Sequence, residues 1–332
     1  MEATPAIAVS GASDIDSPVD QLASLCKASA EPLRLHILRV LERDSFTVTE
    51  LCQLFAIRQP ALSHHLKVLS GAGLVTSRRE GNSLFYRRSQ PGRVDGLEAL
   101  QQQLFDSLDA LPLEPGLGEH LREVQACREA TSRAFFHDNA DKFREQQDLI
   151  ASHWQYGDAV AQVLREARFP RRQRVLEVGP GDGAFLPHLA DQFREVIALD
   201  NAEAMLERAR KRATEAGLDN IRFLHGDTRH PGLAELQVDG VVINMVLHHC
   251  ARPDQIIADT ANCLRSGGLL MVTELCEHDQ AWARDACGDL WLGFSPEALT
   301  HWATLAGLDE HASVYLAQRN GFRLQVRLFG RP

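Results

Sequence analysis

The sequence predicts an α/β protein of two domains, in which a small helical domain closed by a β-hairpin precedes a doubly wound sheet. Three observations lead to this fold class. The chain of 332 residues exceeds one ordinary core, because single domains hold about 100–200 residues. Residues 31–88 have the pattern of three helices and a hairpin. From Arg174 onward, buried strands alternate with helices around a glycine-rich turn.

Composition excludes several classes of protein. Hydrophobic residues make up 44% and charged residues 24% of the chain, as in globular proteins. No apolar stretch approaches the roughly 18 residues that a membrane helix needs. Residues 1–18 lack a basic start and a long apolar run, so we expect a disordered leader and not a signal peptide. The seven cysteines form no C-x-x-C pair, which indicates reduced thiols in a cytoplasmic chain.

The charge is unevenly distributed along the chain. A net charge of −10 would argue against a nucleic-acid partner if it were evenly spread. Residues 19–95 hold eleven Lys and Arg against seven Asp and Glu, a net of +4, which leaves −14 for the remainder. Within 58–93, seven basic residues stand against Glu80 alone. This short segment is therefore a candidate surface for binding a polyanion.

The first two helices of this domain follow from their starting residues. An apolar run after Glu31-Pro32 predicts a helix to about Arg43, because proline is favoured in a first turn. Thr47 predicts the N-cap of a second helix, and Glu50, three residues on, is its capping-box partner.

A third helix and a hairpin complete a winged helix-turn-helix. The helix is spaced by Ala61, Leu62, Leu66 and Leu69 and ends at Gly71 and Gly73. Strands at 74–79 and 83–88 flank the turn Glu80-Gly81-Asn82. In this geometry the third helix enters the major groove of DNA, and the hairpin reaches phosphates or the minor groove. The predicted DNA-binding residues are Gln59, Ser63, His64, His65 and Lys67 on the helix, and Arg78, Arg79, Arg87 and Arg88 on the wing. The alternative is a solvated basic hairpin.

This segment resembles the ArsR-type family of bacterial repressors. The likeness is carried by Ala30-Glu31-Pro32-Leu33-Arg34-Leu35, Glu50-Leu51-Cys52, Gln59 to Leu66 and Gly73-Leu74-Val75. The resemblance implies a homodimer that binds a palindromic operator in double-stranded DNA. A leucine stripe at 97, 100, 104, 108 and 111 suits a dimer seam, or equally packs on its own domain. Metal-sensing members carry paired cysteines near the second helix, whereas Cys52 stands alone here, so no metal site is predicted.

Helix breakers divide the chain after residue 111. Pro112, Pro115, Gly116 and Gly118 interrupt the helical pattern. We therefore predict a DNA-binding and dimerisation domain at 19–111, a helical linker at 112–150 and a second domain at 151–332. The aromatic residues Phe135, Phe136, Phe143, Trp154 and Tyr156 either form core or cover a ligand pocket.

The second domain opens with a βαβ pattern. Strands at 175–178 and 196–200 enclose the turn Gly179-Pro180-Gly181-Asp182-Gly183 and a helix at 185–193. Its glycines let a ligand approach the backbone closely. Gly179, Gly181 and Ala184 also match the dinucleotide pattern G-x-G-x-x-G/A, with Asp200 about 20 residues on.

Three features distinguish a site for another nucleoside-containing ligand from a dinucleotide site. Glu177 ends the first strand, where its carboxylate would repel a pyrophosphate, and burial of Glu177 needs a cation such as the amino group of S-adenosylmethionine. Asp227 follows a third strand, where its carboxylate can accept an adenine amino proton. Strand patterns at 314–317 and 322–328 flank Arg319-Asn320-Gly321 as a terminal hairpin.

These residues are similar to the class I S-adenosylmethionine-dependent methyltransferases. With this resemblance, the predicted fold class is α/β, with an N-terminal winged helix-turn-helix domain and a C-terminal Rossmann-like methyltransferase domain. The matching motifs are Glu177 to Gly183, Asp200, Asp227, Asp239 to His249 and Leu264-Arg265-Ser266-Gly267-Gly268. The resemblance implies a seven-stranded sheet that ends in an antiparallel hairpin. The predicted cofactor-binding residues are Glu177 near the methionine end, Gly179, Gly181, Gly183, Asp200 at the ribose, Asn201, Met205, Gly226, Asp227 at the adenine, Thr228 and Asn244. The alternative is that the carboxylates merely cap helices.

A catalytic residue is harder to assign, because methyl transfer needs mainly proximity and orientation. His248 is the candidate general base, and the alternative is a histidine satisfied in the wall of the crevice. The apolar segment 288–296 lines an acceptor pocket, makes a dimer contact or acts as a plug. Cys250, Cys276 and Cys287 lack the arrangement of arsenite methyltransferases.

Two functions follow from the two domains. The first is a DNA-binding transcriptional regulator, a repressor, whose methyltransferase-like domain binds S-adenosylmethionine or S-adenosylhomocysteine as effector. The second is a bifunctional protein, an active S-adenosylmethionine-dependent methyltransferase of a small molecule with an autoregulatory DNA-binding domain.

Overall fold

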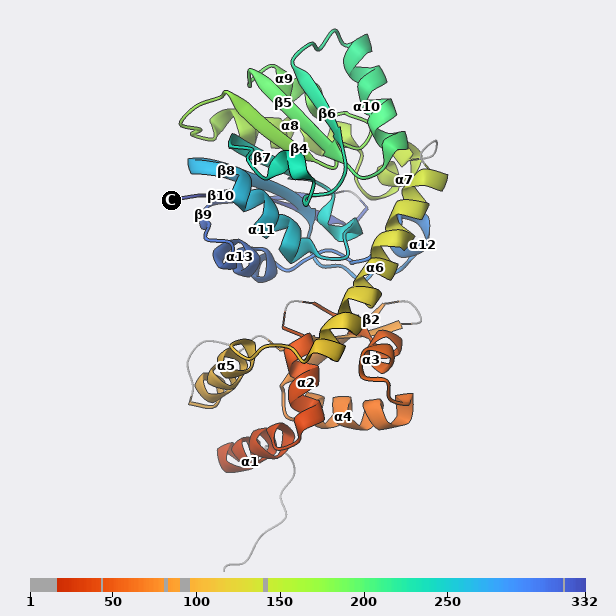
Figure 1. The fold of residues 1–332 in the computed structure, drawn as a ribbon, viewed down its shortest axis with the longest axis vertical. Helices are drawn as coiled ribbons and strands as arrows, with labels where there is room; N and C mark the ends of the chain where they lie inside the picture. Colours follow the sequence, from red (N-terminus) through yellow and green to blue (C-terminus); the bar gives the residue numbers. More distant parts are fainter. Residues whose placement is uncertain (1–16, 43, 81–82, 90–95, 140–142, 319) are drawn as a thin grey trace, which may run out of the picture. The chain divides into compact units, whose positions relative to one another are not determined.

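The computed structural model describes residues 17–42, 44–80, 83–89, 96–139, 143–318 and 320–332. These divide into two compact units (Figure 1), one built mainly from residues before Glu119 and the other mainly from Glu119–Pro332. The division falls inside helix α6 (Pro115–Asp138), which contributes Pro115–Gly118 to the first unit and its other residues to the second. Of the predicted leader, residues 1–16 lie outside the described residues, and Ser17 and Pro18 instead begin a helix.

The first unit is a winged helix-turn-helix, as predicted. Its helices are α1 (Pro18–Ser29), α2 (Pro32–Val40), α3 (Val48–Phe55), α4 (Gln59–Gly71) and α5 (Gly96–Asp109). The strands β1 (Phe46–Thr47), β2 (Val75–Glu80) and β3 (Ser83–Arg88) form a sheet in the order β1-β3-β2. The turn residues Gly81 and Asn82 lie outside the described residues.

Local signals explain these helix boundaries. Thr47 and Glu50 form the predicted capping box of α3, in which each side chain accepts from the other's backbone N–H. A second capping box, between Ser17 and Asp20, starts α1, a helix that was not predicted from the sequence. Helix α2 ends at Val40 and not near residue 43.

The first unit has its own core of leucines. Leu38, Leu51, Leu62, Leu66 and Leu69 are buried. Of the predicted leucine stripe, Leu108 is buried, whereas Leu100 and Leu111 are exposed, and Leu111 lies beyond the end of α5. The stripe is therefore split between packing on its own unit and solvent.

The second unit contains the predicted seven-stranded sheet. In sequence order the strands are β4 (Arg174–Val178), β5 (Glu195–Asp200), β6 (Ile221–His225), β7 (Val238–Asn244), β8 (Leu264–Leu275), β9 (Asp309–Ala317) and β10 (Arg323–Gly330). Their order in the sheet is β6-β5-β4-β7-β8-β10-β9. β10 pairs antiparallel with both neighbours, and the other pairs are parallel. The terminal antiparallel hairpin is thus confirmed. The order reverses at β4, and in such sheets ligands bind where it reverses.

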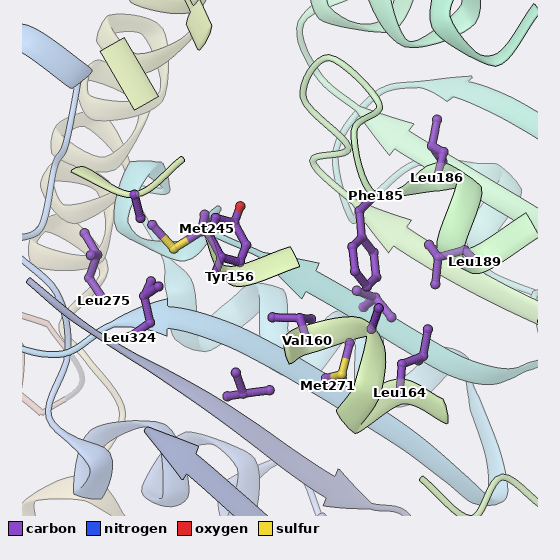
Figure 2. Close-up of a cluster of buried hydrophobic side chains, with 14 of the residues drawn as sticks. Tyr156, Val160, Leu164, Phe185, Leu186, Leu189, Met245, Met271, Leu275 and Leu324 are labelled. Atoms are coloured by element: carbon purple, nitrogen blue, oxygen red, sulfur yellow. The ribbon is translucent and has the colours of Figure 1, made fainter. Parts of the chain in front are cut away.

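Helices cover both faces of this sheet. One buried cluster joins α7 (Phe143–Ile150), α8 (His153–Glu166), α9 (Leu186–Ala190), α10 (Glu203–Glu215) and α12 (Trp282–Cys287) to the strands. Figure 2 shows part of it, including Val160 and Leu164 of α8, Leu189 of α9 and Met271 of β8. The other cluster lies under α11 (Pro253–Cys263) and α13 (Pro296–Leu305). Alternate residues of β8 serve the two clusters, as a strand buried on both faces requires. None of the described helices is both long and apolar enough to cross a membrane.

Candidate functional site

The glycine-rich turn after β4 has a backbone that only glycine adopts without strain. Gly179, Gly181 and Gly183 all have positive φ, at 65°, 57° and 77°. A Cβ added at Gly179 would lie 2.6 Å from a methyl carbon of Val246. The turn is held to β5 by the Gly179 N–H, which donates to the Leu199 carbonyl at 2.8 Å. Because the glycines of this turn carry no side chains, a ligand can approach the backbone at the carboxyl ends of β4 and β5.

Glu177 is a buried carboxyl group with an unpartnered oxygen. The residue is 2% exposed, and its Oε2 has no hydrogen-bond partner among the described residues. Burial, followed by the nearby Asp200, raises the pKa of Glu177 to about 8. Glu177 lines a small cavity beside the glycine turn. An ammonium group placed in this cavity would relieve the cost of the buried charge.

Asn244, at the end of β7, is also buried without partners. Neither its Oδ1 nor its Nδ2 makes a hydrogen bond within the described chain, and Asn244 lines the same small cavity as Glu177. The next residue, Met245, has a φ of 55°, which is unusual for a residue with a side chain. Strained backbone and orphaned polar groups together are typical of a ligand site.

Asp200 is the last residue of β5 and lines a larger cavity of about 640 Å³. Its Oδ1 accepts from the Ala202 N–H at 2.9 Å. Burial raises the pKa of Asp200 to about 6, against the opposing effect of backbone hydrogen bonds from Ala202, Gly181 and Asn201. Its carboxylate can accept hydrogen bonds from a diol such as ribose.

Asn201, Met205, Gly226, Asp227 and Thr228 line the same cavity. The polar groups of the last two are already engaged: Arg229 donates to Asp227 Oδ2 at 2.7 Å, and the Thr228 hydroxyl donates to Asp259 at 2.6 Å. Burial tends to raise the pKa of Asp227, but its bonds with Arg229 outweigh burial and lower it. A ligand amino group would have to share Asp227 with Arg229.

One wall of the large cavity comes from helix α6. Its lining residues include Gln125, Glu129, Arg133 and Phe136. Of these four, only Phe136 is predicted from the sequence as a possible cover, because α6 is polar along most of its length. Of the predicted aromatic cluster, Tyr156 is buried in the core and also lines the small cavity, while the side chains of Phe143 and Trp154 lie outside the described part of the chain.

The structure turns His249, and not the predicted general base His248, toward the large cavity. His249 lines the large cavity, with its ring 4.8 Å from that of Phe136. His248 is fully buried, is bonded through Nδ1 to Glu274 at 2.7 Å, and is not part of the described lining of either cavity. Burial disfavours charge on His248, but Glu274 and Asp289 outweigh burial and raise its pKa to about 8. His248 is therefore not placed to serve as a general base for a ligand in the cavity.

The segment 288–296 packs on the turn that carries these histidines. The indole of Trp291 donates to the Cys250 carbonyl at 2.7 Å, and the Leu290 N–H donates to the His248 carbonyl at 2.8 Å. None of its residues is among the described lining of the two cavities. These contacts do not support the first of the three predicted roles, the lining of an acceptor pocket, and leave the dimer contact and the plug as predictions.

The candidate DNA-binding face of the first unit is partly as predicted. Gln59, Ser63, His64 and Lys67 are exposed on α4. His65 is half-buried instead, with Nδ1 3.5 Å from Glu31. Its ring faces the start of α2, so His65 is not presented with the other four.

On the wing, neighbouring arginines point in different directions. Arg87 is exposed and Arg78 half-buried, while the side chain of Arg79 lies outside the described residues. Arg88 turns inward: it donates to both carboxylate oxygens of Asp109 at 2.8 Å and to the Leu38 carbonyl at 2.7 Å. Its guanidinium also lies 4.4 Å from the centre of the Phe105 ring. The structure therefore contradicts a DNA contact for Arg88, whose bonds tie the wing to α2 and α5.

Comparisons with known proteins match the two units separately. Residues 31–77 match the family model of the bacterial regulatory proteins of the ArsR family, and residues 176–272 match that of the methyltransferase domain. The biofilm growth-associated repressor of Agrobacterium fabrum is 41% identical over 80 residues, 24% of this chain and 68% of that protein. The ubiquinone biosynthesis O-methyltransferase of a Ruegeria strain is 30% identical over 157 residues, 45% of this chain and 63% of that protein.

A third relative and one solved structure resemble the second unit. The biotin biosynthesis bifunctional protein BioHC of Cellvibrio japonicus is 35% identical over 104 residues, but the match spans 31% of this chain and only 20% of that protein. The crystal structure of magnesium protoporphyrin IX methyltransferase from Synechocystis, with bound S-adenosylhomocysteine, has a TM-score of 0.51 at 18% identity. It covers 62% of this chain and all of that one, which shows a shared fold.

Proposed function

The chain belongs to the ArsR family of bacterial regulatory proteins and carries a class I methyltransferase domain, and from this we propose a transcriptional repressor with S-adenosylmethionine or S-adenosylhomocysteine as its effector. The winged helix binds the operator. The second unit senses the cofactor, and its occupancy alters operator affinity.

The chemistry of the donors fits this cofactor. Glu177, whose buried Oε2 lacks a partner, would receive the amino group of the methionine part, and Asn244 supplies further polar groups beside it. Asp200 would accept the ribose hydroxyls, and Met205 and Asp227 border the adenosine. When bound, S-adenosylmethionine supplies an electrophilic methyl group. The residues of this chain bind and orient the cofactor.

The observation that carries the proposal is the position of α6. This one helix contributes its first residues to the DNA-binding unit and then lines the large cavity with Gln125, Glu129 and Phe136. A ligand shifts an equilibrium only when it binds two states differently. If the position of α6 differs between the state that binds DNA and the state that does not, a cofactor that contacts α6 binds the two states with different affinity.

The DNA-binding part of the proposal follows the family. The repressor acts in the cytoplasm as a homodimer on a palindromic operator, with α4 in the major groove. Gln59, Ser63, His64 and Lys67 face the DNA, and Arg78, Arg79 and Arg87 form the basic wing. The exposed Leu100 and Leu111 are available to a dimer interface.

The experiment begins with a duplex selected from a random pool by the full-length protein. Its affinity is then titrated with S-adenosylmethionine and S-adenosylhomocysteine in parallel. We expect one of the two to change operator affinity by about 5- to 150-fold, the usual range of allosteric coupling. Asp200→Ala should retain operator binding and lose the response to ligand. An operator affinity that neither ligand changes would contradict the sensor function.

Methyl transfer to a small molecule is the second candidate function. The large cavity extends from the predicted adenosine residues to Gln255 and Ile256 of α11 and to α6, which leaves room for an acceptor. Formation of S-adenosylhomocysteine in the presence of cell extract, absent in Asp200→Ala, would support it. No turnover with extract, while the cofactor still binds, would leave the sensor as the only function.

A further inference from the structure

A buried group of metal-ligand side chains lies beside the cofactor cavity. His248, His249 and Asp289 each offer one ligand atom, and these atoms lie within 4.8 Å of one another. The two histidines come from the turn after β7, and Asp289 comes from the segment after α12. Asp289 is 2% exposed, so the group is shielded from water.

Several atoms of this group lack hydrogen-bond partners in the described chain. They are Nε2 of His248 and both carboxylate oxygens of Asp289. His248 Nε2 lies 3.9 Å from Asp289 Oδ1, which is too long for a hydrogen bond. The guanidinium of the neighbouring Arg284 donates to the main-chain carbonyls of Asp289 and Leu290 and not to the carboxylate. The charged side chains near this carboxylate are His248, when protonated, and Arg284, and a metal ion bound at His248 Nε2 would take the place of the His248 proton.

Glu274 fixes the orientation of His248. Its Oε1 accepts from the N–H groups of Val246, Leu247 and His248, and its Oε2 accepts from the Leu275 N–H at 3.0 Å. His248 Nδ1 lies 2.7 Å from the same Oε2, so the proton of the ring belongs on Nδ1. The Nε2 lone pair then points toward Asp289, as in the carboxylate–histidine–metal arrangement of metalloproteins.

His249 completes the group. Its Nδ1 lies 3.6 Å from Asp289 Oδ1 and 3.3 Å from the Gly288 carbonyl, and its Nε2 lies 3.3 Å from the side-chain amide of Gln147. Binding of a metal at Nδ1 therefore requires the ring proton to move to Nε2, where the Gln147 amide oxygen can accept it after the amide turns. With metal–nitrogen bonds of about 2.0 Å, tetrahedral ligand atoms lie roughly 3.3 Å apart. The separations here exceed that by less than about 1.5 Å, which side-chain rotations would close.

We propose that His248 Nε2, His249 Nδ1 and the Asp289 carboxylate bind one divalent cation of the zinc class. Two imidazoles and one carboxylate are a common ligand set for zinc, with a fourth position left for water. The cation would tie the turn after β7 to the segment 288–296 and so stabilise the wall that His249 forms. This site does not depend on DNA binding or on an effector role for the cofactor.

The test uses the full-length protein, stripped with a chelator and then titrated with Zn²⁺ or Co²⁺ alone. We expect one metal ion per chain, the visible absorption of tetrahedral Co²⁺, and a rise in Tm. At free zinc about 100-fold above Kd, the rise should be on the order of 5–10 °C. No binding, or binding without a change in Tm, would overturn the proposal.

Asp289→Asn is the decisive variant, because it keeps the shape of the side chain and breaks no hydrogen bond of the carboxylate. It should lose the stoichiometric ion and the zinc-dependent rise in Tm, yet be at least as stable as the wild type in chelator. Glu274→Gln should weaken zinc binding by about 10- to 100-fold, as outer-shell changes do. Asp191→Asn, at an exposed position, is the matched control and should bind zinc like the wild type. Undiminished binding by Asp289→Asn would place the metal elsewhere and overturn the proposal.

Discussion

Arg88 in the first unit and Glu177 in the second are buried charged groups in opposite situations. In the DNA-binding unit, the guanidinium of Arg88 is matched by the carboxylate of Asp109 and the carbonyl of Leu38. In the second unit, Glu177 and Asn244 at the strand ends have buried atoms without partners. This difference distinguishes buried groups that stabilise the fold from buried groups that bind a ligand. A satisfied buried charge is part of the fold, whereas an orphaned buried charge beside a cavity indicates a binding site.

Arg88→Ala should produce the largest loss of stability. It removes a paired, largely buried guanidinium and leaves Asp109 without its partner, so we expect the unfolding free energy of the first unit to fall by about 3 kcal/mol. Urea unfolding followed by circular dichroism measures it. Arg87→Ala, next to it on the same strand, should change stability by only about 0.5 kcal/mol. Unchanged stability in Arg88→Ala would show that the inward pair is not structural.

Asp200→Ala should weaken cofactor binding and leave stability nearly unchanged, because it removes a contact with the ligand and not a contact within the fold. The loss of hydrogen bonds to the ribose should raise the Kd of the cofactor about 30-fold, equivalent to about 2 kcal/mol. Isothermal titration calorimetry on the full-length protein provides the measurement. Asp191→Ala, which alters an exposed carboxylate, is the control. Equal cofactor affinity in Asp200→Ala and wild type would remove Asp200 from the site.

The raised pKa of Glu177 makes cofactor binding depend on pH. With a pKa of about 8 in the unliganded protein, Glu177 carries a proton at pH 6. An ammonium ligand favours the ionised carboxylate, so binding releases that proton. The cofactor Kd should therefore fall by up to about tenfold per pH unit from pH 6 to pH 7.5, above which the ligand amino group itself titrates. Glu177→Gln should bind more weakly and show a flat profile. A wild-type profile equally flat over this range would contradict the assignment.

Glu177 also makes the stability of the unliganded protein depend on pH. The unfolded carboxyl ionises near 4.5, whereas the folded one ionises near 8. The unfolded state therefore binds fewer protons between these values, and stability falls as the pH rises through this window. Glu177→Gln should reduce this loss, measured as Tm between pH 5 and pH 8. A steeper fall in the variant would mean that Glu177 is already paired.

The smallest effects are expected at the exposed DNA-binding surface. Lys67→Ala and Arg87→Ala should each weaken operator binding a few-fold and reduce the slope of log affinity against log salt by about 1. Lys211→Ala, an exposed lysine of the second unit, should change neither quantity. A salt slope unaltered by the first two substitutions would show that they do not contact phosphate.

Much of the fold was predictable, because its signals are local. The Thr47–Glu50 capping box, the glycine turn and the β9–β10 hairpin are each set by residues near one another in the chain. The direction of Arg88 was also within reach. Successive residues of a strand point to opposite faces, so Arg87 and Arg88 could not both face the DNA.

The rest of the site depends on contacts between distant residues. Asp289 meets His248 only through the folded path of the segment after α12, and no spacing rule links positions 41 residues apart. His248 and His249 are adjacent on a tight turn, and only the packing of Glu274 decides which of them faces the cavity. The role of α6 as a cavity wall has no sequence signal beyond Phe136, because its inward residues are polar.

The central claim is that the cofactor cavity and the operator-binding surface are energetically coupled. Coupling between two bound ligands is reciprocal, so the most direct measurement is the cofactor Kd with and without saturating operator duplex. We predict a change of about 5-fold or more, equal to the factor by which the cofactor changes operator affinity. A cofactor Kd that is the same with and without operator would contradict the claim.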